Sequence, residues 1–281
     1  MKVGAYDVVA LETGRFSLDG GAMFGVVPWV FWSKLIPPDE RQRIALAARC
    51  WLIRGNGKNI LVDCGNGTKW NEKLKDIYRL DNSSGDLLAS LRSAAMKPDD
   101  ITDVILTHLH FDHAGGATTL VDGKLVPTFP NARYYVQKDH WELSRRPTEK
   151  DRGSFMRDDF IPLMLHGVLE VVDGEGELFP GIELLVTQGH TSAQQLPKIS
   201  DGKTTVLFCC DLLPTVAHIP WPYVMAYDVR PLVTLEEKKR ILTQAYDEHW
   251  ILFLEHDPSA EAITIKPTEK GFMVDRRLTL S

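Results

Sequence analysis

Short apolar runs of β-strand length recur along the whole chain. The seven clearest runs span residues 50–55, 59–65, 103–110, 132–137, 182–189, 204–211 and 250–257. Several of them are apolar on both faces, which is typical of strands that neighbouring layers cover on both sides. The linker Gly55-Asn56-Gly57-Lys58 between the first two runs predicts a β-hairpin, because Asn-Gly pairs favour tight turns.

Two segments carry apolar residues at helical spacing. Leucines between residues 87 and 91 recur at this spacing after Ser84 and Asp86, either of which could cap the helix. Thr234 and Glu237 have the spacing of a capping box, so a second helix is expected to begin at Thr234. Since strands and helices intermix over the whole length, the pattern predicts a layered α/β fold.

Composition narrows the class of protein. The 281 residues are 44% hydrophobic, which suits a packed core, and we expect a single domain over residues 1–281. The 32 basic and 38 acidic side chains give a net charge of −6, which argues against nucleic-acid partners. The longest apolar run, residues 22–32, is too short to cross a membrane.

The N-terminus and the cysteines favour a cytoplasmic location. Asp7 and Glu12 interrupt any apolar stretch that could act as a signal peptide. Four cysteines in a chain of 281 residues do not make a disulfide framework. We therefore expect a cytoplasmic protein without a membrane partner.

Polar residues follow the apolar runs at the points where the runs end. The cluster His108-Leu109-His110-Phe111-Asp112-His113 follows the third run. Four other runs end in single polar residues, namely Asp63, His190, Asp211 and His256. Loops after strands often hold catalytic groups on a rigid scaffold, so these positions are candidates for one site.

Chance does not readily explain the histidine cluster. With nine histidines in 281 residues, three at a given spacing arise by chance in roughly one chain in a hundred. Imidazole and carboxylate groups are suitable ligands for zinc, manganese or iron. One ion for His108 with His110 and another for Asp112 with His113 is a natural arrangement. His190, Asp211 and His256 are the candidates for further ligands.

These motifs resemble the metallo-β-lactamase superfamily over nearly the whole chain. The resemblance rests on His108-x-His110-x-Asp112-His113, on a later Gly189-His190-Thr191, and on an aspartate and a histidine that close later strands. Within the superfamily, HLHFDHAGG is most similar to the N-acyl-homoserine-lactone lactonase branch and its esterase and organophosphate-hydrolase relatives. The resemblance implies a four-layer αββα sandwich with a metal site at one edge between the two sheets.

The resemblance also implies roles for the candidate residues. Two divalent metal ions are expected: zinc first, with iron, manganese or cobalt as alternatives. The first ion would be held by His108, His110 and His190, the second by Asp112, His113 and His256, and Asp211 would bridge both. Asp63 is similar to the aspartate that orients a ligand histidine in this family. A metal-bridging hydroxide would attack the substrate, and Asp112 would pass the proton to the leaving group.

Candidate substrate-binding residues are His218, Tyr223, Met23 and Trp29. The first two lie in a segment rich in proline and aromatic residues after Asp211. Met23 and Trp29 lie in GGAMFGVVPWVFW, within an N-terminal segment of residues 1–45. We expect this segment to form a wall of a small-molecule pocket, a buried edge, or a homodimer contact through Trp29 and Trp32. By contrast, a histidine in the polar stretch KDHWE, at position 140, is expected to face solvent.

The chain departs from the lactonase pattern at two places. Residues 191–194 read Thr-Ser-Ala-Gln where these lactonases have Thr-Pro-Gly-His, and residues 212–214 contain no tyrosine where the lactonases carry one after the bridging aspartate. The leading hypothesis is a dinuclear metal-dependent hydrolase that opens lactones or cleaves small esters or organophosphates. A glyoxalase-type thioesterase, a phosphodiesterase and a non-catalytic metal-binding relative are the alternatives.

Overall fold

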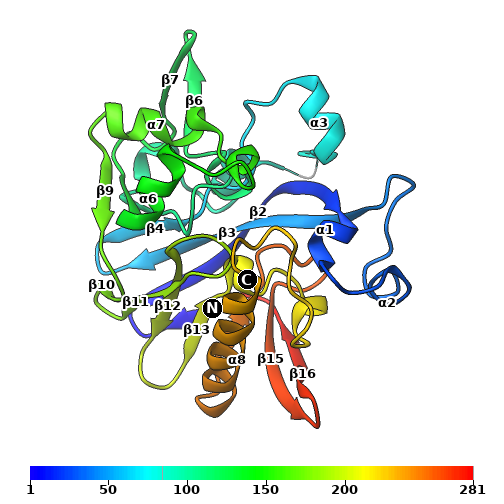
Figure 1. The fold of residues 1–281 in the computed structure, drawn as a ribbon. Helices are drawn as coiled ribbons and strands as arrows, with labels where there is room; N and C mark the ends of the chain where they lie inside the picture. Colours follow the sequence, from blue (N-terminus) through cyan, green and yellow to red (C-terminus); the bar gives the residue numbers. More distant parts are fainter. Residues whose placement is uncertain (84, 281) are drawn as a thin grey trace.

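The computed structural model describes residues 1–83 and 85–280, and two seven-stranded sheets face each other in it (Figure 1). The first sheet has the order β1 (Lys2–Val3), β2 (Tyr6–Asp19), β3 (Arg43–Gly55), β4 (Lys58–Val62), β5 (Asp103–Ile105), β8 (Arg133–Gln137) and β9 (Leu169–Val172). The second has the order β10 (Gly176–Phe179), β11 (Ile182–Thr187), β12 (Gln194–Ser200), β13 (Thr205–Phe208), β14 (Ile251–Phe253), β15 (Ala262–Thr268) and β16 (Gly271–Leu278). A separate hairpin joins β6 (Thr118–Val121) and β7 (Lys124–Pro127).

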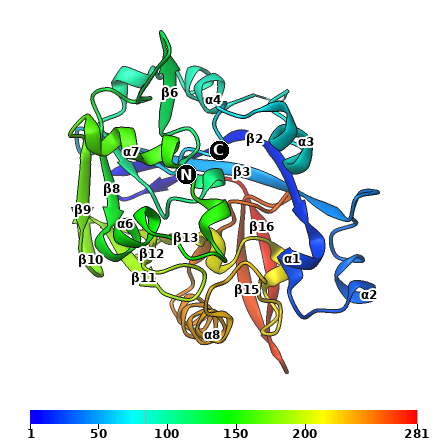
Figure 2. The same cartoon turned by 45° about the horizontal axis from the view of Figure 1, so that its top comes forward.

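The longer helices lie mainly on the outer sides of the sheets, whereas three short ones lie in connections between strands. Their bounds are α1 Gly20–Phe24, α2 Trp29–Trp32, α3 Glu72–Tyr78, α4 Leu87–Ser93, α5 Phe111–Ala114, α6 Lys138–Arg145, α7 Arg157–Leu165 and α8 Pro231–Asp247. Four short 3₁₀ turns span Pro98–Asp100, Arg152–Ser154, Cys210–Leu212 and Val216–His218. Figure 2 shows α8 on the opposite side of the molecule from α4 and α7.

Alternation along the strands explains the layering. In β3, Trp51 and Ile53 belong to the core between the sheets, whereas Cys50 and Leu52 belong to a second core under α4, α6 and α7. Helix α8 packs against the second sheet through buried residues such as Ile241. Each fully buried aliphatic or aromatic side chain of this kind stabilises the fold by roughly 1.5–3 kcal/mol. The arrangement is the mixed α/β fold, with two sheets flanked by helices, that the sequence predicts.

Each of the seven apolar runs contains a strand, and the hairpin forms as expected. Gly55 pairs with Lys58 across the turn between β3 and β4. Asn56 and Gly57 have positive φ values of 51° and 73°, which is the conformation that a two-residue hairpin turn requires.

The helix starts agree with the sequence less well. Asp86 caps α4 by accepting a hydrogen bond from the Ala89 N–H, whereas Ser84 lies outside the described residues. The prediction that the second helix begins at Thr234 with a capping box is wrong, because α8 begins three residues earlier, at Pro231. Proline suits the first turn of a helix because it has no N–H group that needs a partner. Glu237 instead accepts hydrogen bonds from the backbone of residues 188 and 189, at 2.6 and 3.0 Å.

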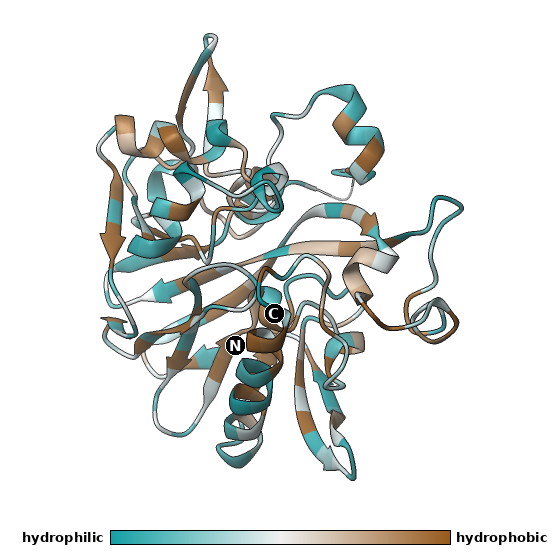
Figure 3. Cartoon of the chain, viewed as in Figure 1, coloured by the Kyte–Doolittle hydropathy of each residue, from teal (hydrophilic) through white to brown (hydrophobic). Residues whose placement is uncertain are grey.

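The apolar N-terminal stretch forms α1 and α2 between the two longest strands. Figure 3 shows α2 as a hydrophobic segment at the edge of the molecule. Trp32 is buried and stacks on Phe24 at 5.4 Å between ring centroids, while Trp29 and Phe31 are 54% and 57% exposed. Among the described residues, no helix combines the length and the apolar character needed to cross a bilayer.

Candidate functional site

The turn after β5 presents the histidine cluster at the edge between the two sheets. His110 precedes the short helix α5, so its neighbours Asp112 and His113 lie within the first turn of that helix. A Cβ atom on Gly115 would lie only 2.2 Å from the Asn66 carbonyl oxygen. The close approach of these two loops therefore requires glycine at position 115.

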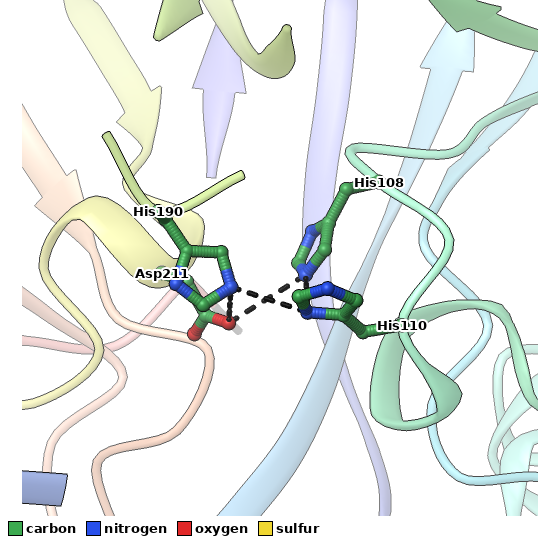
Figure 4. Close-up of side chains that lie close together, drawn as sticks. All are labelled: His108, His110, His190 and Asp211. Carbon is green, nitrogen blue, oxygen red and sulfur yellow. Dashed lines mark hydrogen bonds and ion pairs between the residues drawn. The ribbon is translucent and has the colours of Figure 1, made fainter. Parts of the chain in front are cut away.

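Four ligand atoms converge from both sheets in the first group (Figure 4). His108 Nε2 and His190 Nε2 lie 2.9 and 3.2 Å from His110 Nδ1. Asp211 Oδ2 lies 3.0 Å from His190 Nε2 and 3.6 Å from His108 Nε2. All four side chains are buried, which strengthens the electrostatic interactions among them.

Asp112, His113 and His256 form the second group. The Nε2 atoms of His113 and His256 lie 3.2 Å apart, and each is 3.8 Å from an oxygen of Asp112. Asp211 joins the two groups, because its Oδ1 lies 3.2 Å from His256 Nε2 while its Oδ2 faces the first group and His113 at 3.4 Å. The carboxylate of Asp211 thus stands between the two sets of histidines.

The chemistry of these donors fits divalent metal ions. Ligands about 2.0–2.1 Å from a tetrahedral ion lie roughly 3.3 Å from one another, which matches the separations in both groups. Imidazole nitrogens and carboxylate oxygens at such distances repel one another through their lone pairs unless protons or cations lie between them. Both groups could therefore hold an ion each, with Asp211 contributing to both.

Asp63 supports His113 from behind. Its Oδ2 lies 3.0 Å from His113 Nδ1, so it can accept the proton of this ring nitrogen and leave Nε2 free as a ligand atom. The backbone N–H and the hydroxyl of Thr107 donate to Asp63 at 2.7 and 2.6 Å. These bonds fix the carboxylate that orients the ring.

Two further ring supports were missed in the sequence. His190 Nδ1 lies 2.8 Å from Asp228 Oδ1, and His256 Nδ1 lies 2.8 Å from the Ala47 carbonyl oxygen. Asp228 follows its histidine by 38 residues and Ala47 precedes its histidine by 209. No local pattern reports partners at these separations.

His140 is not solvent-exposed, contrary to expectation. It is fully buried, accepts from the Leu109 N–H at 2.8 Å, and its Nδ1 lies 2.8 Å from the Ser192 carbonyl oxygen. It therefore ties the loop of the histidine cluster to the loop after His190, and burial lowers its pKa to about 4. Both of its partners lie more than 30 residues away in the sequence, so no local pattern could have indicated this position.

The charges of the site act strongly on its histidines. Burial disfavours a charged ring, but the Asp211 carboxylate outweighs burial at both His190 and His256 and raises each pKa to about 9. Asp228 adds to this effect at His190. Although burial opposes ionisation of Asp211, the neighbouring histidines hold its pKa well below the ordinary value.

Other groups respond mainly to burial. Burial lowers the pKa of His108 and of His110 well below the ordinary value, and neighbouring histidines add to the effect. Burial raises the pKa of Glu255 to about 8; His113 opposes this shift and the nearby Asp63 adds to it. The ring of His108 and that of His110 are thus neutral at physiological pH.

A cavity of about 230 Å³ opens above the two groups. Its floor contains His110, Asp112, His190, Asp211 and His256. Its walls are Leu18, Met23, Leu46, Phe111 and Met225, with Tyr78, Tyr227, Lys150, Gly153 and Ser154 as the remaining lining. The structure brings Met23 to this pocket but not Trp29, which donates its indole N–H to Gln42 at 2.9 Å on the exposed surface.

The structure does not bring His218 or Tyr223 to the pocket either. His218 is buried, with Nδ1 2.8 Å from Thr215 Oγ1 and Nε2 2.8 Å from the Met23 carbonyl oxygen. Its ring stacks on Phe24, and Tyr223 packs edge-on against the same phenyl group. Both ring nitrogens of His218 are thus used within the protein, so no substrate contact is assigned to it.

Comparisons with known proteins agree with this geometry. A model of the metallo-beta-lactamase superfamily matches residues 43–256. An N-acyl homoserine lactonase from Bacillus thuringiensis is 29% identical over 223 residues, which cover 75% of this chain and 82% of that protein. The structure of a probable metal-dependent hydrolase from Staphylococcus aureus aligns with a TM-score of 0.89 at 28% identity, over 99% of this chain and 100% of that one. AidC, a dizinc quorum-quenching lactonase, aligns with a TM-score of 0.82 at 21% identity, over 99% and 96%.

Proposed function

The chain belongs to the metallo-beta-lactamase superfamily, and from this premise we propose that it is a dinuclear metal-dependent hydrolase that opens lactones or cleaves small esters. The observation that carries the proposal is the position of Asp211, whose carboxylate lies within 3.4 Å of histidines from both groups: His190 in the first, and His113 and His256 in the second. Homologues and structural neighbours are metal-dependent hydrolases, so the chemical class does not rest on geometry alone.

In this proposal, His108, His110 and His190 hold one ion, Asp112, His113 and His256 hold the other, and Asp211 contributes to both. Zinc is the proposed metal, since nitrogen and carboxylate ligands at these separations suit a tetrahedral ion. Two such ions would lower the pKa of a shared water towards 7 and polarise the substrate oxygen.

Asp112 is the proposed proton carrier. Its carboxylate lines the floor of the pocket, with Oδ1 3.8 Å from His113 Nε2 and Oδ2 3.8 Å from His256 Nε2, so it reaches both the second group of ligands and the cavity that would hold a substrate. The carboxylate then accepts the proton of the attacking water and passes it to the leaving alkoxide. A carboxylate in this place serves as base first and as acid afterwards.

The walls favour a small substrate with an apolar part. Leu18, Met23, Leu46 and Met225 line one cavity with the proposed ligands, and this lining suits an acyl chain or an alkyl ester. Relatives at 29% identity are named N-acyl homoserine lactonases, which supports lactones as the first substrate class. The hydroxyls of Tyr78 and Tyr227 make no hydrogen bond within the described residues, so they are available to a bound substrate.

Metal analysis and a substrate panel test the proposal. We expect close to two divalent ions per chain in carefully prepared protein, and hydrolysis of an acyl-homoserine lactone or an aryl ester. The panel includes a paraoxon-type triester and S-lactoylglutathione, because these separate organophosphate and thioesterase activity from lactonase activity. Fewer than one ion per chain contradicts the dinuclear centre, and an inactive metal-loaded protein contradicts the hydrolase.

We also propose that a second copy of the chain covers the exposed apolar face that residues 26–31 form at the start of α2. Val26, Trp29, Val30 and Phe31 are each more than half exposed and lie within one short segment. Trp32 is not part of this face, because it is 3% exposed and packs inside the molecule. A cytoplasmic location stays a prediction of the sequence.

A further inference from the structure

Glu255 occupies an unusual place directly behind the proposed metal ligands. It follows β14 and precedes His256, and its side chain is fully buried. Its Oε2 lies 3.1 Å from His113 Nδ1, the same ring nitrogen that is 3.0 Å from Asp63 Oδ2. Two buried carboxylates therefore face one N–H group, and Asp63 has the hydrogen-bond geometry.

Apart from the His113 ring, no group in the described part of the chain pairs with Glu255. Neither of its carboxylate oxygens has a hydrogen-bond partner there. The nearby buried cation, Arg49, points elsewhere: its guanidinium bonds to Glu12 and to the carbonyl oxygens of Leu254 and Asp257. A buried carboxyl group without a partner is costly, and folds keep such a group where a cation offsets it.

The balance of charge around the site indicates that bound metal ions are the cations that offset the charge of Glu255. Five buried acidic side chains surround the histidine cluster, namely Asp63, Asp112, Asp211, Asp228 and Glu255. No lysine or arginine within the described residues forms an ion pair with any of them. Two divalent ions would bring four positive charges, which come close to the five negative ones.

We propose that Glu255 is a positioning residue, whose carboxylate lies behind His113 and strengthens binding of the ion that Asp112, His113 and His256 hold. The inference rests on the proposed dinuclear centre. The negative charge of Glu255 makes the His113 ring a better electron donor, and it adds long-range attraction for the ion beyond the ring. Asp63 supplies the hydrogen bond that fixes the ring, since it has the hydrogen-bond geometry and is itself held by Thr107.

This role predicts that Glu255→Gln has different effects on the stability of the metal-free protein and on its affinity for metal. The amide keeps the shape of the side chain but cannot carry a negative charge when the ions bind. Metal-free E255Q is therefore expected to melt at a temperature equal to or above that of metal-free wild type. Its affinity for the ion that Asp112, His113 and His256 hold is expected to fall about 10- to 100-fold, the usual effect of losing a group that supports a ligand.

Asp63→Asn is the matched control. Asp63 accepts two hydrogen bonds from Thr107 in addition to its contact with His113. D63N is therefore expected to lower the melting temperature of the metal-free protein by roughly 3–8 °C as well as its metal affinity. A purely structural role for Glu255 would make E255Q behave like D63N.

The experiment uses the full chain, stripped of metal and titrated with zinc against a chelating indicator, with melting curves recorded before and after loading. Weaker binding of one ion by E255Q without a loss of metal-free stability supports the inference. Wild-type affinity in E255Q overturns it, and so does a metal-free E255Q that melts earlier or fails to fold. If the wild-type protein itself binds fewer than two ions, both the proposed dinuclear centre and the role of Glu255 are contradicted. If wild type and E255Q each bind two ions with equal affinity, only the role of Glu255 is contradicted.

Discussion

Removing the metal should make the stability of the protein depend on pH in a defined direction. In the metal-free protein, Asp211 outweighs burial at His190 and His256 and raises the pKa of each ring to about 9, from 6.5. Both rings therefore carry a proton in the folded protein at neutral pH, whereas most unfolded chains have lost it. This difference stabilises the metal-free fold below about pH 6.5, and the stabilisation is lost as the pH rises through about 9.

The size of the effect follows from the same values. A pKa that rises from 6.5 to about 9 corresponds to about 3 kcal/mol, because each tenfold change in proton affinity is worth roughly 1.4 kcal/mol. His190 and His256 share the carboxylate of Asp211, so their contributions do not simply add. His108 and His110 do not oppose the trend above pH 6.5, because their pKa values are lowered and both rings are neutral there. Glu255, whose pKa burial raises to about 8, acts in the same direction within this window. We therefore expect a loss of at least about 3 kcal/mol in the free energy of unfolding between pH 6.5 and pH 9.5.

Urea unfolding of chelator-treated protein at several pH values within this window measures the loss directly. Zinc-loaded protein is the control, since a ring nitrogen that binds an ion cannot bind a proton, so the histidine contribution should vanish. Calorimetric titration of zinc at pH 7.5 in buffers of different ionisation enthalpy should report proton release. A metal-free protein whose stability does not fall with pH, combined with metal binding that releases no protons, would refute the reasoning.

Four further expectations concern single substitutions. Asp112→Asn should lower kcat about 10²- to 10⁴-fold at saturating zinc, and an unchanged kcat would contradict its role as proton carrier. Tyr227→Phe should lower kcat/KM about tenfold and leave the melting temperature within about 1 °C. Tyr78→Phe, on the more peripheral helix α3, should change kcat/KM less than about twofold. A larger effect of Tyr78→Phe than of Tyr227→Phe would count against the role of Tyr227. Lys238→Met should cost about 2–4 kcal/mol in urea unfolding, because the ammonium group donates to the carbonyl oxygens of residues 218, 220 and 223; wild-type stability would be inconsistent with this role. Trp29→Glu should halve the sedimenting mass without lowering the melting temperature, and an unchanged dimer would exclude this face as the contact.

The sequence predicts those parts of the fold whose signal is local. Central strands such as β13 and β14 are continuous apolar runs, because both of their faces are covered. Strand β2 is not apparent in the sequence, because exposed and buried residues alternate irregularly along it and a glycine and an arginine interrupt the apolar pattern in its middle. The long hairpin of β15 and β16 was missed for the same reason, since its outer half is largely exposed.

The same distinction applies to the site. The turn from His108 to His113 brings four candidate ligands together within six residues, so its spacing is visible in the sequence. The supports of these ligands arise from packing over long separations, as with Ala47 and His256. The substrate residues were placed least well, because a segment near Asp211 in sequence, such as that of His218, folds away from the cavity, while Tyr227 returns to it.

The origin of the ligands in both sheets has a consequence for the order of events during synthesis. His256 is added to the growing chain 148 residues after His108, which corresponds to about 7–30 s at ordinary translation rates. During that interval the first sheet already carries four of the ligands, but its inner face lacks the second sheet that covers it. A nascent chain in this state can capture a metal ion only weakly and exposes apolar surface. Synthesis of the second sheet and of His256 therefore completes the core and the proposed metal centre together, so chains that stop before His256 should be both inactive and prone to aggregate.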